Sequence, residues 1–303
     1  MDTIQPISKE LLKKELNEKH FIRKTRKGSN EIYSLNYHTA PNVLKEIGRL
    51  REITFRASGG GTGKELDLDH YDTDEVCYEQ LIVWSPQDEE IIGGYRYIKC
   101  KNAIQNPSKI GLSTTHYFNF SDQFISEYLP YTIELGRSWV RPDYQPSVNP
   151  RKGLFALDNI WDGLGALIIF NPDINYFFGK VTMYQNYNTD ARNFLLTFIN
   201  HFFPDQQELL LPHSPLDYSA DQDHYLSQID KLTFSEAFKI LNSFVREKKE
   251  FIPPLINIYM NLSPSMKTFG TALNSDFGNV EETAILVRID DIFEDKKERH
   301  LIF

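Results

Sequence analysis

The alternation of apolar and polar positions divides the chain into segments of helical period and segments of strand period. In some segments apolar residues recur every three or four positions, as on the buried face of a helix. In others they alternate with polar residues or form short runs, as in strands. The predicted helices are 8–19, 41–56, 157–170, 189–203 and 233–249, and the predicted strands are 31–37, 77–85, 89–100, 131–140, 175–183, 265–273 and 282–290.

The order of these elements predicts the fold class. Helices and strands are interleaved along the chain, and a short polar turn between 77–85 and 89–100 indicates a hairpin. This order is typical of an α/β protein with a mixed sheet. Because the sequence shows no internal repeat and no low-complexity linker, we expect a basic N-terminal helix and arm over 1–30. A single domain over 31–303, with a polar insertion near 204–230, would follow it.

Composition limits the classes of function. The 303 residues carry a formal net charge of −9, which argues against a nucleic-acid binder. Cys77 and Cys100 have no metal-ligand spacing, and the histidines form no metal motif, so we expect no metal and a reducing, cytoplasmic location. The apolar run 166–170 is far shorter than the roughly 20 residues of a membrane span.

Positive charge is concentrated near the N-terminus despite the acidic total. Lysines and arginines outnumber acids over residues 9–27. Such a segment is either a solvated amphipathic helix and arm, or a docking surface for an acidic partner or an anionic membrane. We therefore keep peripheral contact with the inner face of the membrane as an expectation.

Four short segments place charged side chains inside otherwise apolar runs: 49–56, 67–72, 93–98 and 134–140. Buried charges are costly unless they are paired, so these segments predict an interlocked cluster of ion pairs. Such a cluster is either a structural network or a site where pKa values are tuned for chemistry. Its predicted members are Arg51, Arg96, Arg137, Asp69, Asp72 and Glu134.

The spacing of Glu134 and Arg137 raises a geometric problem. Residues three apart in a regular strand point to opposite faces of the sheet. A β-bulge at Leu135–Gly136 would change this, and glycine is where a bulge is least costly.

The glycine-rich segment 58–64 does not fit a phosphate-binding loop. The loop motif needs glycine where Ser58 stands and a hydroxyl where Glu65 stands, and it should follow a strand rather than a helix. A flexible lid or a turn next to the site is the better interpretation.

The four charged segments, in this order, resemble the motifs of a known family. They read Leu50-Arg51 with Phe55, then 67–72, then Gly93 to Arg96, then Glu134 to Ser138. This series resembles that of N-acylhomoserine lactone synthases. It is still more similar to that of the carrier-protein-dependent N-acyltransferases that make ornithine lipids and related aminolipids, often labelled haemolysin-like.

The resemblance implies a fold and an activity. The fold is the GNAT-like acyl-CoA N-acyltransferase fold. The activity is transfer of a (3-hydroxy)fatty acyl group from the phosphopantetheine thioester of acyl carrier protein to the amine of ornithine, lysine or glycine, for aminolipid synthesis. Two alternatives stay open: a coenzyme A-dependent N-acetyltransferase of a small amine, and a non-catalytic GNAT-like acyl-binding protein. An autoinducer synthase is disfavoured by the long segment beyond residue 205.

The resemblance also suggests roles for individual residues. Glu134 would accept the proton of the amine, directly or through water. A bulge in 131–140 would free a backbone N–H near Ser138 or Trp139 for the thioester oxygen, although relatives usually carry a smaller or sulfur-containing residue at the tryptophan position. The arginines would hold the acids in place or bind a substrate carboxylate, and Asp69 and Asp72 would attract the ammonium group. Catalytic candidates are Glu134, Arg96 and Arg137, and positioning candidates are Arg51, Phe55, Asp69, Asp72, Ser138 and Trp139.

The donor is expected to bind near residues 149–155. The pyrophosphate-binding glycine motif of coenzyme A-dependent relatives is only faintly present there, with Arg151, Lys152 and Gly153 as the candidate donor-binding residues. This favours acyl carrier protein over coenzyme A. Carrier proteins are acidic, so the basic segment 9–27 together with Arg141 would suit such a partner.

Overall fold

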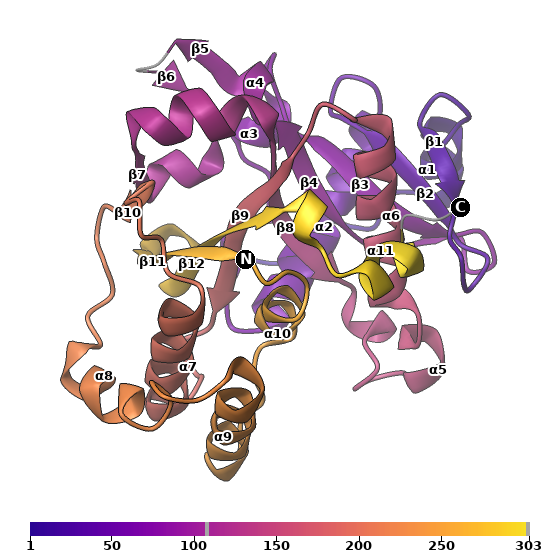
Figure 1. Ribbon diagram of the computed structural model, residues 1–303. Helices are drawn as coiled ribbons and strands as arrows, with labels where there is room; N and C mark the ends of the chain where they lie inside the picture. Colours follow the sequence, from indigo (N-terminus) through magenta and orange to yellow (C-terminus); the bar gives the residue numbers. More distant parts are fainter. Residues whose placement is uncertain (107–108, 301–303) are drawn as a thin grey trace. The chain divides into compact units, whose positions relative to one another are not determined.

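The computed structural model describes residues 1–106 and 109–300, and the chain divides into two compact units. Unit 1 comprises Met1–Leu112, Pro130–Asn175 and the C-terminal segment from Glu294. Unit 2 comprises Ser113–Leu129 and Tyr176–Phe293. Figure 1 labels the elements of both.

Unit 1 is built on an antiparallel sheet. Its strands lie in the order β1 (Phe21–Lys24), β2 (Glu31–Leu35), β3 (Glu79–Ser85), β4 (Glu90–Lys99) and β8 (Thr132–Val140). The two central strands β3 and β4 are buried along most of their length. This burial explains why both read as nearly continuous apolar runs.

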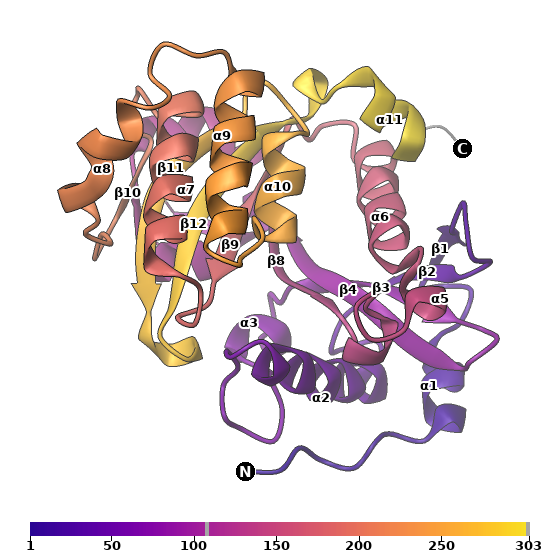
Figure 2. The same ribbon diagram turned by 90° about the horizontal axis from the view of Figure 1, so that it is seen from below.

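Two helices cover this sheet, and Figure 2 shows them on opposite sides of it. In α2 (Pro41–Ala57), the proline occupies the first turn, where its missing N–H costs nothing, and the apolar residues at helical period are buried. In α6 (Ala156–Phe170), Gly163 faces β3, because a Cβ there would lie 2.6 Å from a methyl carbon of Leu81. Helix packing therefore follows the predicted periodicity.

The remaining elements of unit 1 are short. They are α1 (Lys9–Glu15), α3 (His70–Thr73), α4 (Cys100–Ala103), α5 (Pro150–Gly153), α11 (Glu294–His300), β5 (Ile104–Asn106) and β6 (Lys109–Ile110). Helix α1 begins after Ser8, whose hydroxyl accepts a hydrogen bond from the N–H of Leu11. The basic arm is thus a short helix followed by the edge strand β1, which the sequence did not predict.

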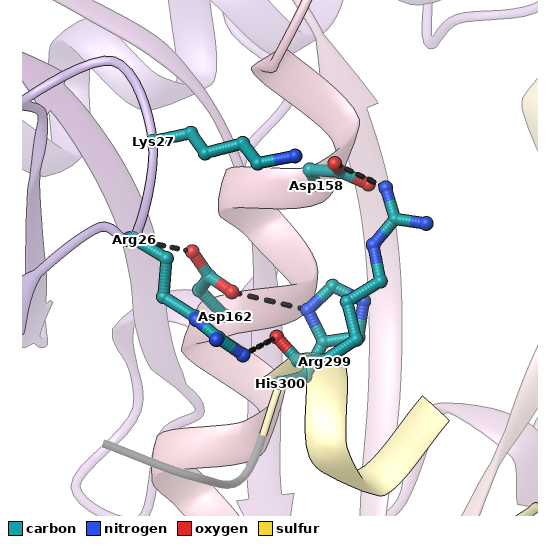
Figure 3. A pocket seen from close by; sticks show the side chains of 6 residues that line it. All are labelled: Arg26, Lys27, Asp158, Asp162, Arg299 and His300. Atoms are coloured by element: carbon teal, nitrogen blue, oxygen red, sulfur yellow. Dashed lines mark hydrogen bonds and ion pairs between the residues drawn. The ribbon is translucent and has the colours of Figure 1, made fainter. Parts of the chain in front are cut away.

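Helix α11 is attached to α6 by a group of charged side chains that line a cavity of about 430 Å³ (Figure 3). Asp162 accepts hydrogen bonds from the backbone N–H of Arg26 at 2.9 Å, and its other oxygen lies 3.0 Å from Nδ1 of His300. Asp158 pairs with Arg299, and the guanidinium of Arg26 donates to the carbonyl of Glu298. These contacts hold the C-terminal end of α11 against α6 and the segment that contains Arg26.

Unit 2 contains antiparallel strands in the order β9 (Tyr176–Met183), β12 (Val280–Arg288) and β11 (Lys267–Asn274). Its helices are α7 (Thr189–Phe202), α8 (Ser219–Leu226), α9 (Phe234–Glu247) and α10 (Pro254–Met260), and a small ribbon pairs β7 (Phe118–Phe120) with β10 (Leu210–Pro212). Aromatic rings fill its core: that of Phe198 lies 4.7 Å from Phe202 and 5.5 Å from Phe234.

The predicted mixed α/β fold class is confirmed, and every predicted helix and strand is present with boundaries shifted by a few residues. The segment 204–230, expected as a polar insertion, contains the strand β10 and the helix α8, and its being an insertion stays a prediction. Helix α8 has little apolar periodicity. Its Tyr225 stacks on the ring of Phe194 at 4.9 Å, and Phe194 lies in α7, outside the segment 204–230. The extent of a single domain over 31–303 stays a prediction.

One helical stretch has the length and mean hydropathy of a membrane span, although it contains no uninterrupted apolar run of that length. Among the described residues, Pro150–Phe170 is long and apolar enough by length and composition. However, 61% of this window is buried inside the protein, as in a core helix. The apolar character reflects packing of α6 on the sheet.

Replacing Asp162 by alanine should loosen α11 and destabilise the protein by about 1–3 kcal/mol, because a partly buried N–H would lose its acceptor. Urea unfolding followed by circular dichroism measures this change. Asp290→Ala, at an exposed position, is the matched control and should leave stability unchanged. Equal stability of the two variants would contradict the assigned role of Asp162.

Candidate active site

Strand β8 contains a β-bulge at Arg137–Ser138. Gly94 of β4 pairs with Trp139 and Arg96 pairs with Gly136, so Tyr95 alone opposes the two residues Arg137 and Ser138. Arg137 has φ +48°, the left-handed conformation that usually requires glycine. The bulge was predicted at Leu135–Gly136 and lies slightly further along the strand.

The bulge changes which side chains share a face. Arg96 and Gly136 are paired, and Ile98 is paired with Glu134, so Arg96 and Glu134 point to the same face of the sheet. A regular strand would direct Arg137 to the other face. The left-handed backbone instead lets Arg137 reach Asp69, which also binds Arg96.

The backbone around the bulge is close to the surface. Residues Thr132–Leu135 are buried, whereas Gly136, Arg137 and Ser138 are partly exposed. Beside the bulge, only glycine fits at position 93 of β4, because a Cβ there would lie 2.4 Å from the carbonyl oxygen of Trp139. The backbone of β8 is therefore partly exposed at the bulge.

The first part of the ion-pair cluster surrounds Arg51 of α2, which is wholly buried. Its Nε donates to Asp67 at 2.9 Å, and its Nη1 donates to Asp72 at 3.1 Å. Asp72 also accepts from the amide of Gln80 at 3.0 Å. Every charge in this group has a partner of opposite sign, which is the condition for burying them.

The second part of the cluster joins β4 and β8 to the same acids. Arg96 lies 2.8 Å from Asp69 and 3.2 Å from Asp72. Arg137 lies 3.0 Å from Asp67 and 3.7 Å from Asp69. The structure thus brings together the three predicted arginines and the predicted Asp69 and Asp72.

The arginines also bind Asp67, an acid that was not among the predicted members of the cluster. Asp67 was visible in the segment 67–72, but its place depends on a contact distant in sequence. Its N–H donates to the carbonyl of Gly48 at 3.0 Å, which fixes it against α2. A regular spacing cannot reveal such a contact.

Aromatic rings lie beside Arg96 of the cluster. The sequence predicted Arg96 as a member but not its aromatic neighbours. The guanidinium of Arg96 lies 5.0 Å from the ring centre of Tyr78 and 5.6 Å from that of Tyr71. Stacking on aromatic faces stabilises a desolvated guanidinium. Tyr71 lies inside the charged segment 67–72 and Tyr78 lies six residues after it, and this proximity was their only signal in the sequence.

The charges of the cluster set the pKa values of its acids. Burial by itself would raise the pKa of Asp72, but the charges of Arg51 and Arg96 outweigh burial and lower it. Burial likewise opposes ionisation of Asp67, whose pKa is lowered by Arg137 and then Arg51. Both aspartates are therefore held ionised at neutral pH.

Glu134 lies fully buried in β8, next to the cluster. Burial raises the pKa of Tyr71, and the charges of Glu134 and then Asp69 raise it further. The phenol of Tyr71 is therefore within electrostatic reach of both acids. Of all the acids near the bulge, Asp69 keeps the most exposed side chain, at 29%.

The glycine-rich segment 58–64 wraps around a buried carboxylate. Glu52 of α2 accepts hydrogen bonds from the N–H of Thr62 at 3.0 Å and of Gly63 at 2.8 Å. Gly61 and Gly63 have φ +97° and +74°, which a turn around this side chain requires. The segment is a turn whose N–H groups bind the protein's own anion, and it leads directly to Asp67.

The other predicted site residues lie in two places. Phe55 is buried on α2 and Trp139 is buried in β8, whereas Ser138 is partly exposed at the bulge. The predicted donor-binding residues Arg151, Lys152 and Gly153 lie apart from the cluster, in α5. There the amine of Lys152 is 3.2 Å from Asp88, and a Cβ at Gly153 would lie 2.5 Å from the nitrogen of Pro146. Within residues 1–106 and 109–300, no group of three or more His, Cys, Asp or Glu side chains is placed to hold a metal.

Comparison with known proteins gives the class of this arrangement. A family model described as an acetyltransferase (GNAT) domain matches residues 50–151, which include the whole ion-pair cluster and the bulge. Among solved structures, the acyl-homoserine lactone synthase LasI is similar with a TM-score of 0.42 and 11% identity, covering 89% of this chain and 94% of that chain. A coenzyme A-dependent acyl-homoserine lactone synthase, BjaI, has a TM-score of 0.39 and 13% identity, covering 89% of each chain. The bulged strand and the family match define an acyltransferase with a GNAT-type domain.

Two relatives are similar over nearly the whole chain. Both are named glycine N(alpha)-acyltransferase, one from Phocaeicola vulgatus and one from Bacteroides thetaiotaomicron. Each is 52% identical over 301 residues, which cover 99% of this chain and 92% and 89% of the relatives. The chain belongs to the family of these N-acyltransferases. The predicted resemblance to GNAT N-acyltransferases is confirmed, and the alternative of a non-catalytic acyl-binding protein is set aside.

The lowered pKa values predict how stability depends on pH. A carboxylate whose folded pKa lies below its unfolded value stabilises the fold above about pH 4, and this stabilisation is lost as the pH falls further. Asp67→Asn should cost about 3–5 kcal/mol at pH 7, because the wholly buried Arg51 and the partly exposed Arg137 lose a charged partner. The difference in free energy of unfolding between this variant and the parent protein should become smaller as the pH falls below about 4. Urea unfolding at pH 7, 4 and 3 measures it, with the exposed Asp2→Asn as control, and a gap independent of pH would contradict the assignment.

Proposed function

We propose that this chain transfers a (3-hydroxy)fatty acyl group from a phosphopantetheine thioester to the α-amine of glycine, in aminolipid synthesis. The observation that carries the proposal is the bulge at Arg137–Ser138, where accessible backbone of β8 lies beside a preorganised set of charges. Glycine is preferred to ornithine and lysine because both relatives carry glycine in their names.

The two least buried charges of the cluster suit a small amino acid. The side chain of Asp69 is 29% exposed and that of Arg137 is 17% exposed, and their nearest charged atoms are 3.7 Å apart. Asp69 would bind the ammonium group of glycine and Arg137 its carboxylate. Arg51, Asp67, Asp72 and Arg96 are buried and hold this pair in place.

The proposed reaction begins with loss of a proton from the glycine ammonium. Glu134 accepts it through a water molecule, because its side chain is fully buried and has no direct approach from the surface. The amine nitrogen then attacks the thioester carbonyl carbon, and the backbone N–H at Ser138 stabilises the oxygen that becomes negative. The carbonyl re-forms as the C–S bond breaks, the attacking nitrogen loses its second proton to give the amide, and that proton neutralises the thiolate that leaves.

The arrangement around α5 favours a carrier protein as donor. A coenzyme A pyrophosphate needs available cations, but Lys152 is paired with Asp88 and Arg141 lies 2.8 Å from Asp143. A phosphopantetheine arm on a carrier protein carries less negative charge than coenzyme A, so it needs fewer cations from the enzyme. Exposed basic residues remain for an acidic carrier: Lys14, Lys19, Lys24, Lys27 and Arg151.

A cytoplasmic location at the inner face of the membrane is part of the proposal. Val148 and Leu154 are each 64% exposed and flank the exposed Arg151. Aliphatic and basic side chains on one segment suit an anionic lipid surface. An acylated amino acid would also partition into lipid after release.

Two variants separate the proposed roles of the acids. Glu134→Gln should lower kcat by about 10²–10⁴-fold with little change in glycine KM, because only proton transfer is lost. Asp69→Asn should chiefly raise the KM for glycine, because it removes the charge that binds the ammonium group. Steady-state assays of N-acylglycine formation measure both constants, and circular dichroism checks folding. If Glu134→Gln keeps the parental kcat, another group accepts the proton.

The donor is tested by supplying the same acyl group in two forms. Acyl carrier protein should give a kcat/KM at least tenfold above that of acyl-coenzyme A, and salt should reduce this preference because charge attraction drives docking. A higher kcat/KM with acetyl-coenzyme A would instead support the second candidate, a coenzyme A-dependent acetyltransferase of a small amine, for which the GNAT domain match speaks.

A further inference from the structure

Arg137 occupies a backbone conformation that its residue type disfavours. Its φ is +48°, in the left-handed region where a side chain crowds the following carbonyl and glycine is normally found. Arg137 is one of the two residues of β8 that oppose Tyr95 of β4. Its left-handed conformation therefore accommodates the extra residue of the bulge. Something in the fold must stabilise it.

Asp67 provides that stabilisation. The Nε of Arg137 donates to both carboxylate oxygens of Asp67, at 3.2 and 3.0 Å. Asp67 is wholly buried and is itself fixed by Arg51 at 2.9 Å and by its N–H on the carbonyl of Gly48 at 3.0 Å. The carboxylate is therefore fixed relative to α2, and its hydrogen bonds hold the side chain of Arg137 against the cluster.

Without this pull, position 137 would return to extended backbone. The bulge would then straighten, and the pairing register between β4 and β8 would shift by one residue. Such a shift turns each following side chain of the strand to the opposite face of the sheet. Arg137 would point away from Asp69, and the N–H groups at the bulge would return to ladder pairing.

We propose that Asp67 is a positioning residue of the transfer reaction. By binding Arg137 it keeps residue 137 left-handed, and so keeps the backbone of β8 in the shape that receives the thioester oxygen. The catalytic consequence rests on the proposed function, whereas the conformational part does not.

A matched pair of variants isolates the backbone effect. Arg137→Gly and Arg137→Ala both remove the guanidinium, so both should raise the glycine KM equally. They differ in the cost of the left-handed conformation, so kcat should be about fivefold higher for the glycine variant than for the alanine variant. Equal kcat values would overturn the proposal.

Substitution of Asp67 in two backgrounds tests its link to Arg137. Asp67→Asn should lower kcat when residue 137 is arginine, but not when it is glycine, because glycine needs no partner to adopt this conformation. Asp67→Glu, which keeps the charge but changes its reach, serves if the asparagine variant does not fold. The same fractional loss of kcat in both backgrounds would show that Asp67 acts otherwise and would overturn the proposal.

Thermal unfolding separates this proposal from the proposed function. Arg137→Gly should melt roughly 2–4 °C above Arg137→Ala whatever the substrate is. If the parent protein transfers no acyl group to glycine but this difference is present, the proposed function fails while the left-handed conformation at position 137 stands. The conformational role of Asp67 then stands if Asp67→Asn lowers the melting temperature more when residue 137 is arginine than when it is glycine, and an equal loss in both backgrounds overturns it. If transfer occurs and the melting temperatures of Arg137→Gly and Arg137→Ala coincide, the positioning role is overturned.

Discussion

The burial of Arg51 between Asp67 and Asp72 is the interaction on which the rest of unit 1 depends. A guanidinium that is wholly buried would destabilise the fold by several kcal/mol without partners, so the segment 67–72 must lie against α2. Each of the two acids then binds a second arginine, Asp72 that of β4 and Asp67 that of β8. One buried cation thereby fixes a loop and two strands relative to a helix.

The same constraint would prepare the proposed site for chemistry. Because the acids and arginines are already paired and oriented, the charges nearest the surface are fixed before any substrate arrives, which is the condition for electrostatic catalysis. The turn around Glu52 adds to this rigidity. It uses backbone N–H groups that resemble an anion-binding loop to bind a side chain of α2, and so delivers residue 67 at a defined place.

Much of the fold could be predicted because helical and strand period follow from burial of one face. The main helices and strands of both units obey that rule. The exceptions have physical reasons: β1 is a four-residue edge strand in which no residue is buried, and Tyr225 of α8 packs on Phe194, outside its own segment. Periodicity detects neither, since neither has a buried stripe of its own.

For the site, the sequence by itself determined that charges in apolar runs must pair and that β8 needs a bulge for Arg137 to join them. It could not determine which acid completes the cluster or where the bulge lies. Those depend on pairs far apart along the chain, Asp67 with Gly48 and Asp67 with Arg137, which only the folded backbone brings within hydrogen-bonding distance. Local sequence specifies the charges to be buried, and tertiary packing decides which of them meet.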